Sequence, residues 1–305
     1  MSSGLKMFFA RHTAKNNQLL SVATLGPGDR DFLVCQFCKA KVAFVNTYQR
    51  SGRTVAAYLR LWPGVEHSIN CKNVLKDSVK QLVADSRNTE QANDIFHAQS
   101  DGFIFRMNVL VDAEHEMRRA EKNLEEAKDP ADKERKRTLY QSTQKRISDY
   151  FNSAAGIAKI RARIEDSTDK KALSEMVKIE FNKQHIQWND FFYEEQRYPA
   201  LFKKAAQLKH PVAILLTVKT AAKLIPTAKK PFFSLKGEVA EEKQTERFAP
   251  AINTLAEELL SNFSPEDELI VVGRVQVSTK EWQSLLYKNL TFWIAHKKQV
   301  TKISE

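Results

Sequence analysis

Short stretches in which apolar and polar residues alternate dominate the first third of the chain. Between residues 54 and 62 every second side chain is apolar, namely Val55, Ala57, Leu59 and Leu61. Such alternation predicts a β-strand with one buried face. An apolar run at residues 42–47 precedes it, and the turn dipeptide Ser51-Gly52 lies between the two. We therefore expect a hairpin, followed by a helix that starts near His67 and continues through Val83.

Further strands are expected around this hairpin. Residues 5–10 and 19–25 are short apolar stretches that lead through the Gly26-Pro27-Gly28 turn, and we expect them to pair with the hairpin. Residues 103–111 are also largely apolar and are predicted to form a strand. We assign residues 1–110 to one domain.

Residues 112–150 change in character, because Glu, Lys, Arg and Ala dominate and apolar residues are widely spaced. Pro130 divides this region into two expected helices, since proline is favoured at a first helical position. Helices are also predicted at residues 151–166 and 168–182. We assign residues 111–183 to a helical arm. Its weak apolar stripe indicates a solvated face, with homodimerisation through the arm as the alternative.

The apolar pattern of the last third of the chain predicts a sheet with helices. Strands are predicted at residues 211–218, 232–239, 269–277, 290–295 and 299–303, with a helix at 250–262 and a short helix at 280–287. We therefore predict an α+β fold in which residues 184–305 form a mixed or antiparallel sheet. The alternative is a small β-barrel of the oligonucleotide-binding kind, which would need the helix at 250–262 to be inserted between strands.

Composition limits the classes of function. The chain has 305 residues, 42% of them hydrophobic, and contains no run of 18 apolar residues, so no membrane span and a cytoplasmic location are expected. The net charge of +11 favours a polyanionic partner, such as nucleic acid.

The chemistry concentrates between residues 35 and 71. All three cysteines lie there, two of them as a Cys-x2-Cys pair, and His67 stands four residues before the last. Three thiolates and one imidazole form the closed ligand set of a structural zinc site. A helical turn would bring the last two ligands to one face. We therefore predict that Zn²⁺ is held by Cys35, Cys38, His67 and Cys71; the alternative is that the cysteines are buried thiols.

The expected order of a Cys-x2-Cys turn, a hairpin and a helix resembles a treble-clef zinc finger. Residues 1–86, with Cys35, Cys38, His67 and Cys71 as the matching positions, also resemble the N-terminal part of the competence-protein CoiA-like family. That resemblance implies bacterial DNA handling or defence and, in many members, a restriction-type nuclease core. Here Tyr58-Leu-Arg-Leu-Trp62 precedes Glu66-His67 where the family more often has an aromatic residue beside histidine.

The predicted zinc module is rich in basic residues with aromatic residues among them. Basic side chains position phosphates, and exposed aromatic rings stack on bases. We predict nucleic-acid contacts, with DNA rather than RNA, from Lys39, Lys41, Arg50, Arg53, Arg60 and Trp62. The alternative is a solvated basic face whose aromatic residues pack the module onto its neighbour.

No phosphate loop, dinucleotide fingerprint or nucleophile elbow is present, and we predict no catalytic residue. The only restriction-type candidates are Glu238 and Glu241-Glu242-Lys243, with Asp190 as a distant acidic partner. A zinc-stabilised nucleic-acid-binding protein is therefore our first hypothesis. The alternatives are a protein-interaction subunit of a larger complex and a Mg²⁺-dependent nuclease.

Overall fold

The structure is a computed structural model, and it describes residues 5–50, 53–87, 95–100, 102–108, 130–164, 167–227, 231–243 and 245–304. It contains both helices and many strands, so the prediction of an α+β fold is confirmed. In the described part of the chain, no helix is long and apolar enough to cross a membrane.

Small antiparallel sheets frame the N-terminal part. They are formed by β1 (Phe9–His12) between β2 (Gln18–Ser21) and β3 (Leu33–Cys35), by β4 (Val42–Val45) with β7 (Tyr58–Leu61), and by β5 (Tyr48–Arg50) with β6 (Arg53–Val55). Short 3-10 helices occupy the connections: η1 (Thr13–Lys15), η2 (Val22–Thr24) and η3 (Pro27–Phe32). Met7 and Leu59 exchange backbone hydrogen bonds of 2.9 and 2.8 Å, so the first segment does pair with the hairpin.

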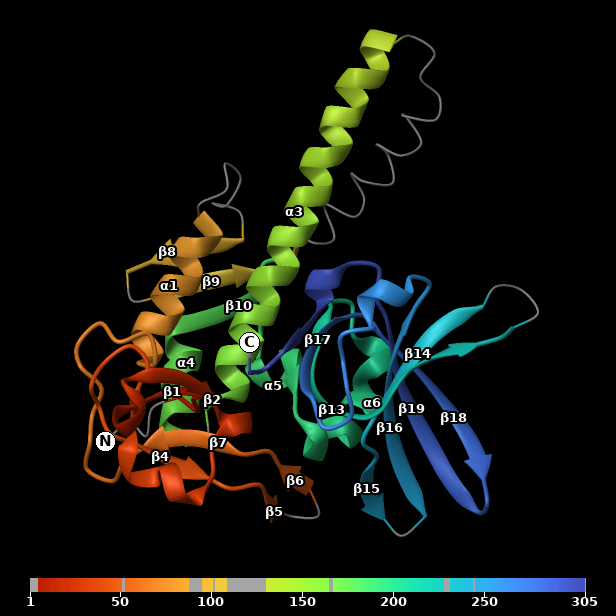
Figure 1. The fold of residues 1–305 in the computed structure, drawn as a ribbon. Helices are drawn as coiled ribbons and strands as arrows, with labels where there is room; N and C mark the ends of the chain where they lie inside the picture. Colours follow the sequence, from red (N-terminus) through yellow and green to blue (C-terminus); the bar gives the residue numbers. More distant parts are fainter. Residues whose placement is uncertain are drawn as a thin grey trace.

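Helices and a second sheet occupy the middle of the chain. They comprise α1 (Leu75–Arg87), β8 (Phe96–Gln99), β9 (Gly102–Arg106), α3 (Pro130–Ala162), α4 (Ser167–Met176), β10 (Val177–Phe181) and β11 (Gln184–Ile186). The strands form a four-stranded sheet in the order β11-β10-β9-β8. The helix α3 lies between the N-terminal strands and the C-terminal sheet, and its first half projects beyond both (Figure 1).

The C-terminal part is a strongly curved mixed sheet. Its elements are α5 (Trp188–Phe191), β12 (Phe192–Tyr193), η5 (Glu195–Arg197), α6 (Tyr198–Lys204), η6 (Ala205–Gln207), β13 (Val212–Ile225), β14 (Phe232–Gly237), β15 (Ala240–Lys243), β16 (Glu246–Thr254), η7 (Glu257–Leu259), β17 (Glu268–Gly273), β18 (Val275–Trp282), β19 (Leu285–Trp293), η8 (Lys297–Gln299) and β20 (Val300–Lys302).

This sheet closes on itself. The strands β17 and β18 are two halves of one extended segment broken at Arg274; β17 pairs with β13, whereas β18 pairs with β19. The sheet continues through β16 and β14 back to β13, and β16 and β19 run parallel. Counting β17 and β18 as one strand, this is the strand order of a five-stranded oligonucleotide-binding barrel.

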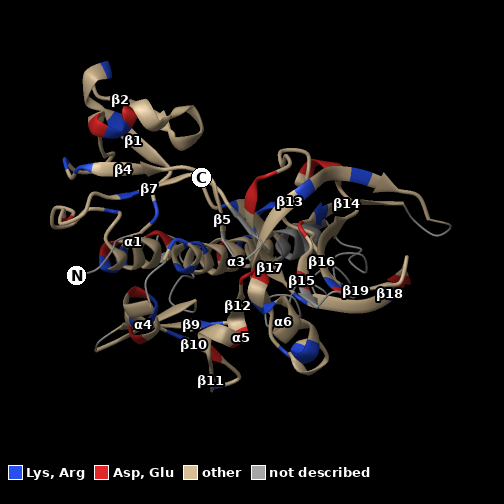
Figure 2. Ribbon diagram, turned by 90° about the horizontal axis from the view of Figure 1, so that it is seen from below, with Lys and Arg blue, Asp and Glu red and all other residues tan. Residues whose placement is uncertain are grey.

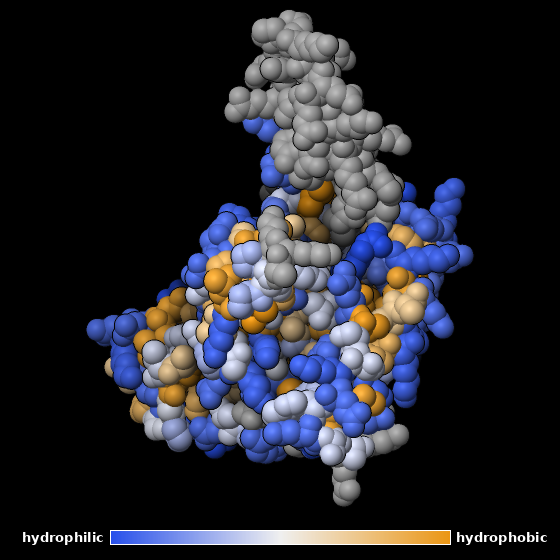
Figure 3. All heavy atoms as spheres, turned by 90° about the vertical axis from the view of Figure 1, so that its right-hand side faces the viewer, coloured by the Kyte–Doolittle hydropathy of each residue, from blue (hydrophilic) through white to orange (hydrophobic). Residues whose placement is uncertain are grey.

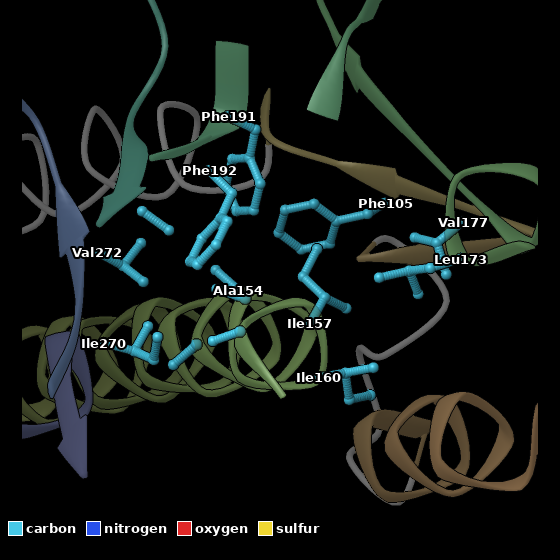
Figure 4. Packing of buried hydrophobic residues seen from close by; sticks show 14 of the residues in the cluster. Phe105, Ala154, Ile157, Ile160, Leu173, Val177, Phe191, Phe192, Ile270 and Val272 are labelled. Carbon is cyan, nitrogen blue, oxygen red and sulfur yellow. The ribbon is translucent and has the colours of Figure 1, made fainter. Parts of the chain in front are cut away.

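The helix α3 joins the parts through one core. Its Ala154 and Ile157 share this core with Phe105 of β9 and with Ile270 and Val272 of β17 (Figure 4). The barrel has its own interior cluster, in which Leu216, Phe248 and Phe292 are fully buried. The domain boundaries proposed at residues 110/111 and 183/184 stay a prediction.

Two predicted helices in the last third of the chain are wrong. Residues 250–262 were expected to be helical, but Pro250 and Ile252 lie in β16, where Phe248, Pro250 and Ile252 alternate toward the interior. Residues 280–287 form a hairpin, because Gln283 and Ser284 have φ of 49° and 61°. Two consecutive positive φ angles define a type I′ turn, which reverses the chain without helix.

The predicted helix at residues 168–182 is also too long, since only its first part is helical. The helix α4 ends at Met176 and β10 follows. Asn182 and Lys183, with φ of 51° and 62°, then turn β10 back into β11. Pro130 begins a helix as predicted, but residues 151–162 continue that helix instead of forming a separate one. The other helix expected before Pro130 lies outside the described residues, as do residues 109–111 of the predicted strand.

We expect the substitution Gly102→Ala to lower the free energy of unfolding by about 1–3 kcal/mol. Gly102 begins β9, and a Cβ placed on it would overlap the carbonyl oxygen of Met176 at the end of α4, where only backbone could move away. Urea unfolding with Gly28→Ala as control tests this, since a Cβ at Gly28 meets no atom within 4 Å. Equal stabilities of the two variants would contradict the close approach.

Candidate metal centre and nucleic-acid interface

The four predicted metal ligands converge from two loops. Cys35 ends β3, and its backbone N–H donates to the carbonyl of Ala40 at 2.8 Å, which folds Cys38 back toward it. The β4–β7 hairpin then returns the chain, and His67 and Cys71 follow it. The ligand atoms of Cys35, Cys38, His67 and Cys71 all lie within 4.8 Å of one another. The group can therefore hold a metal ion.

The spacing of these atoms fits a tetrahedral ion. The Sγ atoms of Cys35 and Cys71 are 3.8 Å apart, and Nδ1 of His67 lies 3.4 Å from the Sγ of Cys38 and 3.5 Å from that of Cys71. Tetrahedral zinc, with Zn–S of about 2.3 Å and Zn–N of about 2.0 Å, requires edges of about 3.8 and 3.5 Å. All three cysteines are free of disulfides.

Burial sets the protonation of these ligands in the metal-free protein. It raises the pKa of Cys71 to about 12 and lowers the pKa of His67, which favours the neutral imidazole that a metal needs. At Cys38 burial pushes the pKa upward, but hydrogen bonds from the backbone at Ser68 and Ala40 outweigh it and keep the pKa below its ordinary value. A metal would have to displace the Cys71 proton on binding.

The predicted helix starting near His67 is wrong, because α1 begins only at Leu75. Asn70 has a φ of 65°, a left-handed conformation that a helix cannot contain between His67 and Cys71. The pair converges instead through a tight turn, in which the N–H of Cys71 donates to the carbonyl of Ser68 at 3.1 Å.

The structure places part of the predicted nucleic-acid surface together. The ring of Trp62 lies under the Nζ of Lys41, at 4.2 Å, and near the guanidinium of Arg30, at 5.2 Å. Lys39 and Arg60 are exposed. The side chains of Arg50 and Arg53 lie outside the described ones. These contacts leave the predicted nucleic-acid role of the module a prediction.

A second basic and aromatic surface lies on the barrel, and we call it the barrel face: the outward side of β14, β16, β18 and β19. Its β19 positions oppose small residues of β16, as Asn289 opposes Ala249 and Thr291 opposes Ala251. A groove of about 440 Å³ crosses it, and its lining includes Lys219, Lys236, Lys280, Trp282, Tyr287 and Asn289. The view of the barrel side in Figure 3 shows hydrophobic and hydrophilic residues interspersed on this surface.

Aromatic pairs stand at both ends of the barrel face. At one end the rings of Trp282 and Tyr287 are 6.2 Å apart, and at the other those of Phe232 and Trp293 are 5.1 Å apart. The side chains of Trp282 and Trp293 are 53% and 40% exposed, which is unusual for so large an apolar residue. From Tyr287 to Trp293 the strand spans about 20 Å at 3.3 Å per residue.

The lysines of this face are largely free to meet an anion. Within the described ranges, no carboxylate pairs with Lys236 or Lys280, whereas Lys219 lies 3.6 Å from Glu238. Figure 2 shows Lys and Arg along β13 and β14. The sequence interpretation missed this surface because it read residues 280–287 as a helix. The alternation of Gln276, Ser278, Lys280 and Trp282 was the signal that could have revealed it.

The described acidic residues of the nuclease hypothesis each pair with a different basic residue. Asp190 pairs with Lys204 at 2.5 Å and Glu241 with Arg247 at 3.0 Å, each on a different element. The side chains of Glu242 and Lys243 lie outside the described ones. In the ranges that the structure describes, the Cys35–Cys38–His67–Cys71 group is the only cluster of this kind able to hold a metal.

Comparisons with known proteins found no matching family model and no matching curated protein. Among solved structures, a small single-stranded DNA-binding protein from Streptomyces coelicolor matches with 17% identity and a TM-score of 0.20, over 27% of this chain and 85% of that one. The second single-stranded DNA-binding protein of Mycobacterium smegmatis matches with 13% identity and a TM-score of 0.19, over 30% and 86%. These TM-scores are too low to establish a shared fold.

Proposed function

We propose that this protein binds single-stranded nucleic acid along the barrel face and that zinc in the Cys3His centre stabilises its N-terminal part. The observation that carries the proposal is the lysine-lined groove between two exposed aromatic pairs. Lysines neutralise phosphates, and exposed rings stack on bases.

The shape of the barrel face favours a single strand over a duplex. Its middle is made of small side chains, such as Ala249, Ala251 and Ser278, so the face lacks the projecting helix that reads a duplex groove. Exposed aromatic rings on a flat surface stack on the faces of unpaired bases, which a duplex keeps covered by its own stacking. A single nucleic-acid strand that lies along the barrel face would contact one aromatic pair at each of its ends.

Zinc fits the donor set of the Cys3His centre. Thiolates are soft ligands that select zinc over magnesium or calcium, and four protein ligands leave no open position for a reacting water. The zinc therefore has a structural role in this proposal. Lys39, Lys41, Arg60 and Trp62 on the same module form a second candidate contact surface.

We expect the double substitution Lys236→Gln, Lys280→Gln to weaken binding of oligothymidylate and to flatten its dependence on salt. Each phosphate contact to a single strand contributes about 0.7 to the slope of log affinity against log salt, so the slope should fall by about 1.4. Fluorescence anisotropy at several salt concentrations measures it.

The control is a second double variant that loses the same two positive charges outside the barrel face. Lys171 and Lys178 are exposed on α4 and β10, outside the barrel, and their double substitution by Gln should leave the slope unchanged. Equal slopes for both double variants would contradict binding at the barrel face. A matched oligouridylate series shows whether the surface distinguishes DNA from RNA.

A further inference from the structure

Among the described residues, Arg163 is a cation with no carboxylate beside it. It follows the last residue of α3 and is partly buried, and within the described part of the chain no carboxylate lies within ion-pair distance of it. Burial lowers its pKa to about 10, so it keeps its charge at neutral pH. Removing a charge from water is costly unless a nearby negative group offsets it.

The hydrogen bonds of Arg163 lead to the metal centre. Its Nη2 donates to Oδ1 of Asn73 at 3.0 Å, and Nδ2 of Asn73 donates to the Sγ of Cys35 at 3.4 Å. Asn73 is only 1% exposed. Arginine can only donate, so the carbonyl oxygen of the amide must face Arg163 and its NH2 group must face the sulfur. Cys35 therefore acts as an acceptor, which suits a metal-bound thiolate.

The charge of a loaded centre complements that of Arg163. Three thiolates exceed the two positive charges of zinc by one, and a neutral histidine adds none, so the loaded centre is a monoanion. The backbone N–H of Phe37 also points to the Sγ of Cys35, at 3.5 Å. The two described partners of the Cys35 Sγ outside the ligand set are both N–H donors, as hydrogen bonds to a metal thiolate require.

We propose that Asn73 and Arg163 form an outer shell of the metal centre, in which Arg163 is the counter-charge of the zinc thiolates and Asn73 connects the two. This inference rests on the zinc site proposed above. The same residue fastens α3, because the Nε of Arg163 donates to the carbonyl of Lys6 at 2.7 Å and the N–H of Lys6 donates back to the carbonyl of Arg163 at 3.0 Å. Metal binding therefore strengthens the attachment of the end of α3 to the N-terminal part.

The test is the zinc affinity of the full chain, measured by competition with a chromophoric chelator. We expect Arg163→Met and Asn73→Leu to bind zinc about 10- to 100-fold more weakly than the wild type, as is usual for the loss of an outer-shell partner. Arg163→Lys should retain part of the affinity, because it keeps the charge. Arg161→Met is the matched control, since Arg161 lies two residues before Arg163, in the last turn of α3, but faces Glu194, at 3.8 Å.

A second readout separates this role from simple packing. In the cobalt-loaded protein, loss of the N–H donor in Asn73→Leu should shift the thiolate-to-cobalt charge-transfer band, and Arg161→Met should not shift it. If Arg163→Met and Arg161→Met keep wild-type zinc affinity while both lose stability, Arg163 has only a packing role and the inference is overturned. A wild-type protein that binds no zinc would instead overturn the zinc site itself.

Discussion

Loss of the metal from the Cys3His centre is expected to unfold the N-terminal part and to be the most damaging single change in the chain. The core beside the centre is small: Met7, Ala10, Leu25, Leu33, Val42 and Leu59, with Cys35 and Cys71 themselves. Structural zinc contributes about 10–16 kcal/mol of apparent binding free energy in zinc-finger peptides at neutral pH. We expect chelation or Cys71→Ser to lower the free energy of unfolding by several kcal/mol.

Metal content and thermal unfolding of matched histidine variants test this prediction. His67→Ala should lose the equivalent of one zinc per chain and unfold at a lower temperature. His97→Ala should keep both metal and stability, because His97 is exposed on β8 and lies outside the centre. Identical zinc content in the two variants would contradict the assignment of His67 as a ligand.

The second large effect is expected at the aromatic pairs of the barrel face. Stacking on one aromatic ring is worth about 1–3 kcal/mol per base, so Trp282→Ala and Trp293→Ala should each weaken oligothymidylate binding by about 5- to 150-fold. The two tryptophans are on different pairs at opposite ends of the face, so their effects should be close to additive. Anisotropy titrations of the two single variants and the double variant measure this.

Trp62→Ala is the control that separates the two candidate surfaces. Trp62 belongs to the zinc module, where Lys41 and Arg30 lie against its ring. We expect its loss to change affinity by less than either barrel substitution. A large effect of Trp62→Ala together with a small effect of Trp282→Ala would instead locate binding on the module, as the sequence interpretation predicted.

The convergence of the four candidate ligands could be predicted from the sequence because its signal is local. All three cysteines of the chain lie within one short stretch, and the Cys-x2-Cys spacing already brings two of the thiols together. The geometry of the second pair could not be predicted, since the left-handed Asn70 replaces the expected helical turn. The hydrogen bond between Asn73 and Arg163 could not be predicted either, because 90 residues separate them in the chain.

The barrel shows why the proposed nucleic-acid surface was missed. The barrel turn between β18 and β19 carries Gln283-Ser284 at positive φ, and the turn between β10 and β11 in the four-stranded sheet carries Asn182-Lys183. Asn-Gly or Asp-Gly at these positions would have signalled a hairpin. Pro250 in β16 also argued against a strand, yet the pairing of β16 with both β14 and β19 holds it in the sheet. Contacts between distant segments decided these elements, as is common for strands.

Ultraviolet crosslinking of the wild-type protein to a single-stranded oligonucleotide, followed by peptide mapping, tests the proposed function most directly. Photoadducts form where bases lie against aromatic side chains, so the map reports the contact surface without any substitution. We predict adducts on β18 and β19, at Trp282, Tyr287 or Trp293. Adducts confined to the zinc module, or none under conditions where binding is saturated, would contradict the barrel face as the nucleic-acid interface.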